Sequence, residues 1–143
     1  MLINTWKRND LLEQTVAHYA TCEGVDAIRV VWSEPVPPSA DLQRKLEDKV
    51  EIGSRKKYQQ VDLRFDVHVQ DNLNNRFKPL DGLRTDAVFS IDDDVLVPCP
   101  TLEFAFSVWT SAPDSMVGFV PRMHWVESTV KTFLCSSLFM MCC

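Results

Sequence analysis

Apolar residues recur along this chain with two different spacings, which predict different elements. Leu2-Ile3 forms a short apolar start, and residues 27–32 are rich in β-branched side chains, so both segments predict strands. Between them, four apolar residues recur at helical spacing up to about Thr21: Leu12, Val16, Tyr19 and Ala20. The order strand, helix, strand predicts a right-handed parallel βαβ unit.

The ends of the first helix also have sequence signals. Asp10, with Glu13 three residues later, resembles a capping box, which predicts Asp10 as the N-cap. Gly24 is expected to stop the helix. Three prolines within residues 35–38 predict a loop, and residues 41–50 predict a charged, weakly amphipathic helix.

The second half of the chain continues the alternation of strands and helices. Residues 61–69 alternate apolar and polar side chains, which predicts a strand with one solvated face. Residues 71–78 predict a short helix, and residues 87–91 predict a central strand. An apolar helix that begins near Pro100 is expected to be largely buried, with Phe104, Phe106 and Trp109 in the core, and residues 116–120 predict another strand. The pattern as a whole is α/β.

Three consecutive aspartates, residues 92–94, follow the apolar run of residues 87–91. In parallel α/β sheets, ligands bind at the carboxyl ends of strands, which is where these acids are expected. Their mutual repulsion and the cost of desolvating them would be offset by a divalent cation, and oxygen ligands suit manganese, magnesium or calcium. Such a cation can neutralise a diphosphate. The alternative is an acidic turn that merely solvates the end of the strand.

Composition narrows the classes of function. With 45% hydrophobic and 24% charged residues, the 143-residue chain is typical of one soluble globular domain, or part of one. The net charge of -5 argues against nucleic-acid binding, and the basic cluster of residues 55–57 predicts a solvated loop. The five cysteines show no zinc-binding spacing, and their odd number leaves at least one thiol free or bonded to another chain.

Two segments bear on membrane association. The N-terminus lacks the long apolar stretch of a signal peptide or anchor. The apolar run of residues 133–143 has about half the length needed to span a bilayer. No anchor is therefore expected within this sequence.

Several segments together resemble the exostosin-like glycosyltransferases, family 64 of the glycosyltransferases. They are TWKRNDLL (5–12), VVW (30–32), LNNRF (73–77), SIDDD (90–94), and the run from FAFSVW (104–109) to VGFVPR (117–122). The resemblance implies a GT-A (Rossmann-like) fold, a uridine diphosphate (UDP) sugar donor, Mn2+ (or Mg2+), and sugar transfer with retention to a glycan or glycolipid acceptor. It also implies a Golgi or endoplasmic reticulum membrane location and allows an oligomer.

The resemblance assigns roles by position. The residues implied to bind the UDP-sugar are Asn4 and Arg8 at the uridine end and phosphates, Ser33 and Asp71 at the uridine, Arg76 at the nucleotide or its phosphates, and Asp92 and Asp93 at the ribose and the sugar. Asp94 matches the direct metal ligand.

The resemblance covers only part of the family's domain. We expect a partial exostosin-like domain over residues 1–125 and a divergent tail over residues 126–143. The acceptor site and the catalytic acid have no counterpart here, so the catalytic residue is unknown and the hypothesis is a chain with weak or no transferase activity. One alternative is a non-catalytic nucleotide-binding fragment. A more remote one is a phosphatase of the haloacid dehalogenase type, which also places two acids one residue apart after an apolar strand.

Overall fold

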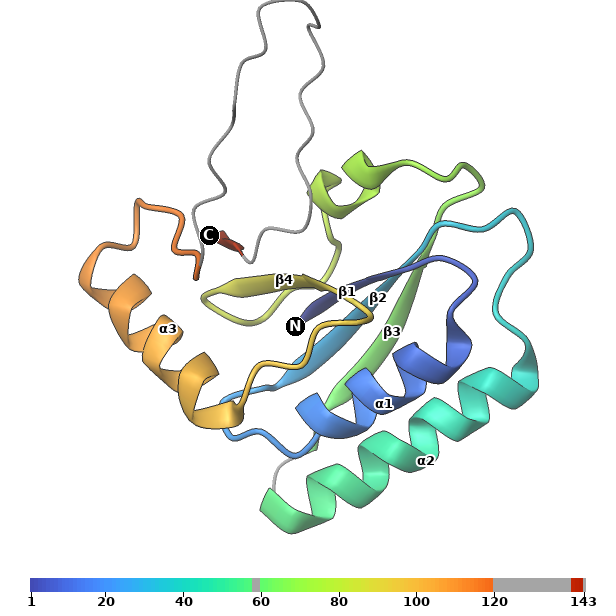
Figure 1. The fold of residues 1–143 in the computed structure, drawn as a ribbon, viewed down its shortest axis with the longest axis horizontal. Coiled ribbons are helices and arrows are strands. Elements are labelled where there is room, and N and C mark those ends of the chain that lie inside the picture. The colour runs from blue at the N-terminus through green and yellow to red at the C-terminus, as the bar shows by residue number, and fades with distance from the viewer. Residues whose placement is uncertain (58–59, 120–139, 143) are drawn as a thin grey trace, which may run out of the picture.

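A computed structural model describes residues 1–57, 60–119 and 140–142 (Figure 1). Its elements, in chain order, are β1 (Leu2–Thr5), α1 (Asn9–Tyr19), β2 (Ala27–Trp32), α2 (Ala40–Lys57), β3 (Asp62–Val67), the 3-10 helix η1 (Leu73–Phe77), β4 (Val88–Asp92), α3 (Cys99–Ser111) and β5 (Met140–Cys142). The predicted domain boundary at residue 125 lies outside the described residues.

The strands form one sheet in the order β3-β2-β1-β4-β5. The first four are mutually parallel, and β5 pairs antiparallel with β4. Two parallel neighbours, β1 and β2, are joined through α1, so the predicted parallel βαβ unit and the α/β class are confirmed. Parallel pairing requires β1, β2 and β4 to present their carboxyl ends at the same edge of the sheet.

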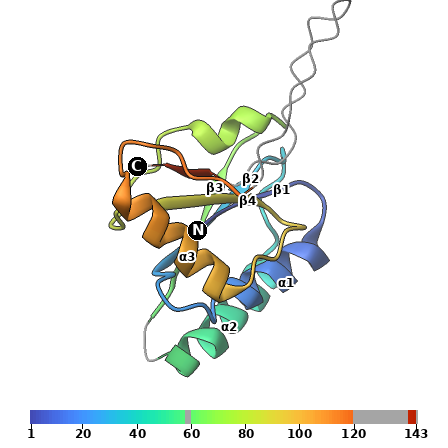
Figure 2. The same cartoon turned by 60° about the vertical axis from the view of Figure 1, so that its left-hand side comes forward.

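Helices α1 and α2 lie side by side against the sheet (Figure 1, Figure 2). Gly53 of α2 is packed closely on Ala20, because a Cβ atom at Gly53 would lie 2.7 Å from the Cβ of Ala20. The hydrophobic core is continuous across the sheet and all three α-helices, and Ile3, Tyr19 and Leu46 are among its fully buried members.

Two predictions about helix ends are wrong. The N-cap of α1 is Arg8, without a side-chain cap, and Asp10 lies in the first turn instead, where its charge favours the helix dipole. Helix α2 continues to Lys57 rather than ending near residue 50, so the basic cluster of residues 55–57 lies in a helix and not in a loop. Ion pairs one turn apart, such as Lys45 with Asp41 at 3.1 Å, support this polar helix.

The prediction for the apolar helix is wrong in part. Trp109 is buried as expected, but Phe104 is 64% exposed and Phe106 is 44% exposed. Only the face of α3 that carries Leu102, Ala105 and Trp109 is buried. Apolar residues occur all around this helix, so its sequence does not indicate which face meets the core.

The strand predicted at residues 116–120 is not present over the described part of that segment. Residues 116–119 contain a single bridge residue, Val117, and residue 120 lies outside the described residues. No helix that the structure describes is long and apolar enough to cross a bilayer.

A disulfide that the sequence did not reveal joins Cys22 to Cys99, with their Cα atoms 5.2 Å apart. Cys22 lies in the turn after α1, and Cys99 is the first residue of α3. The bond therefore links the end of α1 to the start of α3, across 77 positions in sequence.

Candidate functional site

Most of the predicted site residues lie together at the carboxyl edge of the parallel sheet. Asn4 of β1 is the register partner of Asp92, the last residue of β4. The Nδ2 atom of Asn4 donates to the carbonyl of Ile91 at 2.9 Å, and the carbonyl of Asn4 accepts from the backbone N–H of Asp93 at 3.0 Å. The end of β1 thus fixes the start of the aspartate run.

Arg76 and Asp92 form a largely buried ion pair. The Nη2 atom of Arg76 lies 2.6 Å from Oδ1 of Asp92, and the two side chains are only 9% and 17% exposed. Arg76 belongs to η1, and its Nε also donates to the carbonyl of Leu73 at 3.3 Å. This pair anchors η1 to the end of β4.

Arg8 contacts the other two aspartates. Its Nη2 lies 2.5 Å from Oδ1 of Asp93, and its Nη1 lies 2.9 Å from Oδ2 of Asp94. The side chains of Arg8 and Asp94 are 44% and 48% exposed, whereas that of Asp93 is fully buried. The guanidinium of Arg8 thus joins a buried carboxylate, that of Asp93, to an exposed one, that of Asp94.

Asp93 is held from several directions. Its Oδ2 accepts from the hydroxyl of Thr5 at 2.7 Å, and its backbone carbonyl accepts from the hydroxyl of Thr15 at 2.6 Å. Burial raises the pKa of Asp93, while the hydrogen bond from Thr5 and the charge of Arg8 act in the opposite direction. In this conformation the carboxylate of Asp93 faces protein groups rather than solvent.

The two remaining candidates differ in their surroundings. Ser33, just after β2, is buried, and its Oγ accepts from Nδ2 of Asn75 at 2.9 Å. Because Asn75 precedes Arg76 in η1, this bond connects Ser33 to the arginine side of the site. Asp71 is exposed in the loop before η1, and no hydrogen bond or ion pair links it to the other candidates within the described part of the chain.

The donor set fits a divalent cation of the manganese or magnesium type. Asp92 pairs with largely buried Arg76, and Asp93 accepts a hydrogen bond from the buried hydroxyl of Thr5. Of the three carboxylates, that of Asp94 is the exposed one. Magnesium is commonly held by one or two carboxylates together with substrate phosphates, and carboxylate oxygens suit manganese as well. Three carboxylates facing two guanidinium groups leave a net negative charge, which favours a cation.

A second group of metal-ligating atoms, from His18, Cys22 and Cys99, has its members within 4.8 Å of one another. The two sulfur atoms are joined in the disulfide, and thiolates rather than disulfide sulfurs bind metals. The Nε2 atom of His18 lies 2.7 Å from the carbonyl of Val97. In this state the group is a structural crosslink.

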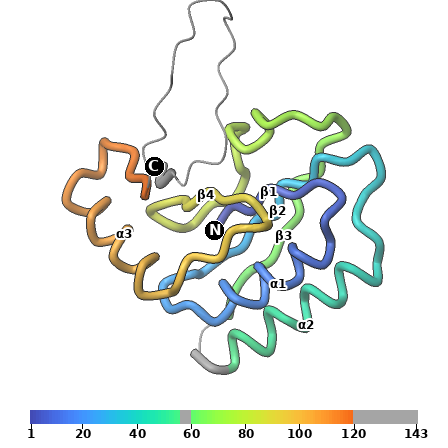
Figure 3. Tube along the Cα trace, viewed as in Figure 1, coloured from blue at the N-terminus to red at the C-terminus, as the bar shows by residue number. Residues whose placement is uncertain are grey.

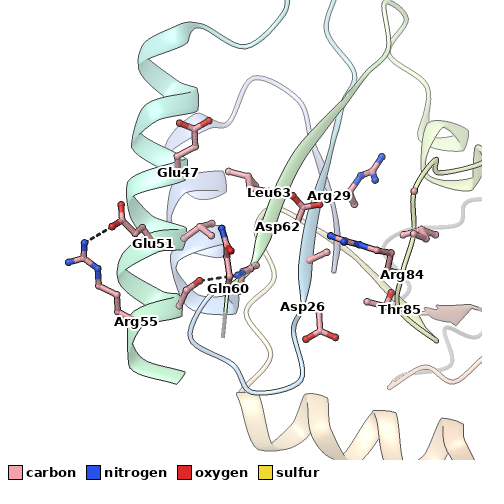
Figure 4. A pocket seen from close by; sticks show the side chains of 16 residues that line it. Asp26, Arg29, Glu47, Glu51, Arg55, Gln60, Asp62, Leu63, Arg84 and Thr85 are labelled. Atoms are coloured by element: carbon pink, nitrogen blue, oxygen red, sulfur yellow. Dashed lines mark hydrogen bonds and ion pairs between the residues drawn. The ribbon is translucent and has the colours of Figure 1, made fainter. Parts of the chain in front are cut away.

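Two cavities lie at the opposite edge of the sheet. The larger, about 1010 Å³, lies beside the amino ends of β2 and β3 and is lined by Asp26, Arg29, Asp62 and Arg84, among others (Figure 4). The smaller, about 360 Å³, lies between Met1 and α3, where Leu102, Glu103 and Phe106 line it. Neither is lined by a predicted site residue, because those residues lie at the carboxyl edge, where ligands bind in parallel α/β sheets.

Sequence reasoning missed four polar residues that shape the site: Thr5, Thr15, Tyr19 and Asn75. Thr5 and Thr15 bond to Asp93, and Tyr19 bonds to the backbone of Val95 and Val97 just after the aspartate run. Thr15 and Tyr19 lie on the same buried side of α1 as Val16. A hydroxyl group repeated on the apolar face of a helix was the available signal, because buried hydroxyls require partners.

The four parallel strands with helices packed against them define the class as an α/β protein with a Rossmann-like sheet. The chain belongs to glycosyltransferase family 64, because the model of the glycosyl transferase family 64 domain matches residues 1–141. The resemblance drawn from the sequence segments is thereby confirmed, and the membership favours a transferase over the phosphatase alternative.

Curated relatives agree with this assignment. The chain is 56% identical, over 129 residues, to glycosylinositol phosphorylceramide mannosyl transferase 1 of Arabidopsis thaliana, covering 90% of this chain and 38% of that protein. It is 33% identical over 124 residues to human exostosin-like 2, covering 87% and 35%. It is 34% identical over 136 residues to glycosyltransferase family protein 64 C3 of Arabidopsis thaliana, covering 94% and 40%. The chain thus spans two fifths or less of the length of these relatives.

Proposed function

We propose that this chain carries the donor site of a metal-dependent, retaining glycosyltransferase with a GT-A fold. The donor is a UDP-sugar, and the group transferred is a hexosyl or N-acetylhexosaminyl unit. The observation that supports this most strongly is the run of residues 92–94 at the carboxyl edge of the sheet, where Arg8 pairs with exposed Asp94 and Arg76 pairs with Asp92. A metal ligand beside two phosphate-binding cations is the arrangement that a nucleoside diphosphate requires.

Asp94 would hold the cation, Mn2+ (or Mg2+), through its exposed carboxylate. The bound cation supplies Lewis-acid stabilisation of the departing diphosphate. Arg8 now neutralises Asp94, and its partial exposure allows the guanidinium to turn toward phosphate oxygens instead. Its second nitrogen is paired with buried Asp93, and this pair would loosen when Asp93 turns toward the sugar.

The remaining candidates would bind the nucleotide and the sugar. Arg76 would have to leave its largely buried pair with Asp92 to contact the nucleotide or its phosphates, and Asn4 would contribute at the uridine end. Ser33 and Asp71 flank the uridine in this proposal, with Ser33 held in place by Asn75. Asp92 and Asp93 would face the ribose and the sugar, and Asp93 would have to turn partly away from its buried partners to do so.

The acceptor is proposed to be a glycan or a glycolipid. The Arabidopsis relative at 56% identity is named as a mannosyl transferase of glycosylinositol phosphorylceramide, which supports a hexose donor and a glycolipid acceptor. The Cys22–Cys99 disulfide supports a Golgi or endoplasmic reticulum location, because structural disulfides persist in oxidising compartments. The catalytic acid is not assigned to any residue of this chain.

Titration calorimetry with UDP, with and without Mn2+, tests the proposal. We expect UDP binding that requires Mn2+ and that Asp94→Ala abolishes. Asp48→Ala, which removes an exposed carboxylate from α2, is the matched control and should bind like the unaltered chain. GDP in place of UDP tests the uridine contacts. Absence of UDP binding, or equal binding by both variants, would refute the donor site.

A transfer assay with UDP-hexoses and glycolipid acceptors distinguishes the two remaining possibilities. Manganese-dependent UDP binding together with sugar transfer supports the full proposal. Binding without transfer supports the alternative of a non-catalytic nucleotide-binding chain.

A further inference from the structure

One side of α1 contacts the segment that carries Asp94. We call residues 93–98, between β4 and α3, the acidic loop, and we call Thr15, His18, Tyr19 and Cys22 the α1 clamp. The four clamp positions follow the spacing i, i+3, i+4, i+7, which places them on one side of the helix and its following turn. The acidic loop runs back alongside α1 toward α3 (Figure 3).

Hydroxyl groups of the clamp satisfy the backbone of the acidic loop. Thr15 donates to the carbonyl of Asp93 at 2.6 Å. The hydroxyl of Tyr19 donates to the carbonyl of Val95 at 3.2 Å and accepts from the N–H of Val97 at 2.9 Å. Because this loop has no regular secondary structure, the hydroxyl groups of α1 supply the hydrogen bonds that a neighbouring strand would otherwise provide to its backbone.

His18 and Cys22 complete the contact. The Nε2 atom of His18 lies 2.7 Å from the carbonyl of Val97, and a carbonyl only accepts, so Nε2 carries the proton. The Cys22–Cys99 disulfide then fixes the residue that follows the loop. Every odd-numbered position from 93 to 99 is therefore attached to the clamp.

This alternation determines where Asp94 points. Asp93 and Val97 are buried and Val95 is half-buried, whereas Asp94 and Leu96 are exposed. Asp93 and Asp94 are the central residues of a turn in which the N–H of Val95 donates to the carbonyl of Asp92 at 3.2 Å, so holding Asp93 and Val95 against α1 fixes this turn with Asp94 on its exposed side.

We propose that the α1 clamp positions Asp94 for metal binding, with Tyr19 and His18 as positioning residues and the disulfide as its covalent end. This inference rests on the proposed function, because it assigns a purpose to the orientation of the proposed metal ligand. Loss of a clamp contact would leave Asp94 in place in the sequence but allow its carboxylate to sample other directions. Residues that orient metal ligands typically change metal affinity by about 10- to 100-fold when they are substituted.

Tyr19→Phe is the central variant, because it removes one hydroxyl and leaves the buried ring. Thr21→Val is the matched control: it removes a hydroxyl from the same helix end, and that hydroxyl bonds only to the carbonyl of His18 among the described residues. Mn2+ affinity is measured from the electron paramagnetic resonance signal of free Mn2+ in the presence of UDP. Hydrogen exchange of residues 93–98 is measured in the same proteins without metal.

We expect Tyr19→Phe to weaken Mn2+ binding by about tenfold or more and to accelerate exchange in the acidic loop while β1 and β2 remain protected. Thr21→Val should change neither. Reduction of Cys22–Cys99 in the unaltered chain should act in the same direction as Tyr19→Phe.

Other outcomes separate the two proposals. Unchanged Mn2+ affinity in Tyr19→Phe overturns the clamp, as does an equal effect in Thr21→Val or faster exchange throughout the sheet. If the unaltered chain binds no Mn2+, the proposed metal site fails. The clamp is then supported as a loop-ordering device if loop exchange still responds to Tyr19→Phe, and it is overturned if exchange does not.

Discussion

The same substitution at two aspartates two positions apart should have opposite consequences for stability and for metal binding. Asp92 pairs with Arg76, and both side chains are largely buried, whereas Asp94 pairs with Arg8 at the surface. Asp92→Ala leaves the guanidinium of Arg76 without its charged partner in a site that is 9% exposed. Breaking a buried pair costs about 3–5 kcal/mol, and since a single contact joins these two, we expect about 3 kcal/mol.

Asp94→Ala removes only a half-exposed ion pair, which is worth less than about 1 kcal/mol because solvent screens it. Urea unfolding followed by tryptophan fluorescence measures both values. With a urea dependence of about 2 kcal/mol per M, Asp92→Ala should lower the midpoint by about 1.5 M and Asp94→Ala by less than about 0.5 M. Metal binding should show the reverse selectivity, with Asp94→Ala the variant that abolishes Mn2+ binding.

A double variant tests the physical reason for this difference. Arg76→Met combined with Asp92→Leu leaves no unpaired charge, so it should be more stable than Asp92→Ala. Equal midpoints for Asp92→Ala and Asp94→Ala, or a double variant less stable than Asp92→Ala, would refute the assignment of a buried pair at η1.

Two further predictions concern the scaffold. Gly53→Ala should lower the free energy of unfolding by about 1–3 kcal/mol, because the added Cβ would collide with Ala20. The same change in an exposed helix is favourable by about 1 kcal/mol. Thermal unfolding measures the effect, and a more stable Gly53→Ala protein would contradict the close contact between Gly53 and Ala20. Asp66→Ala should cost about 3 kcal/mol in urea unfolding, because it strips the bidentate partner from Arg29, which is nearly buried. Asp62→Ala, on the same strand but in an exposed pair with Arg64, should cost less than about 1 kcal/mol, and equal losses would argue against the buried pair.

Elements with one strong signal could be predicted from the sequence. The β-branched run of β2 and the apolar run of β4 each gave a strand with nearly correct bounds. The convergence of Asn4 and Asp92 also followed from topology, since parallel strands share a carboxyl edge. Apolar runs and parallel pairing predict that strand ends meet at one edge, whereas the roles of Asn4, Arg8 and Arg76 came only from the family resemblance.

The remaining features depend on contacts that carry no local signal. Thr15 and Tyr19 bond to backbone groups of the acidic loop, and backbone groups are the same at every residue. Cys22 and Cys99 are 77 positions apart, and with five cysteines the spacing selected no pair. Phe104 is exposed although it is apolar, so residue type alone did not indicate which side of α3 is buried.

The proposed function depends most directly on a metal–diphosphate site at Asp94. Anomalous diffraction at a manganese-sensitive wavelength, from crystals of this chain grown with UDP and Mn2+, locates that ion without assumptions. We predict a single manganese peak within coordination distance of the Asp94 carboxylate, with the diphosphate between it and Arg8. A crystal in which UDP is bound at the amino-edge cavity near Arg29 and Arg84, or in which no manganese lies at Asp94, would contradict the account.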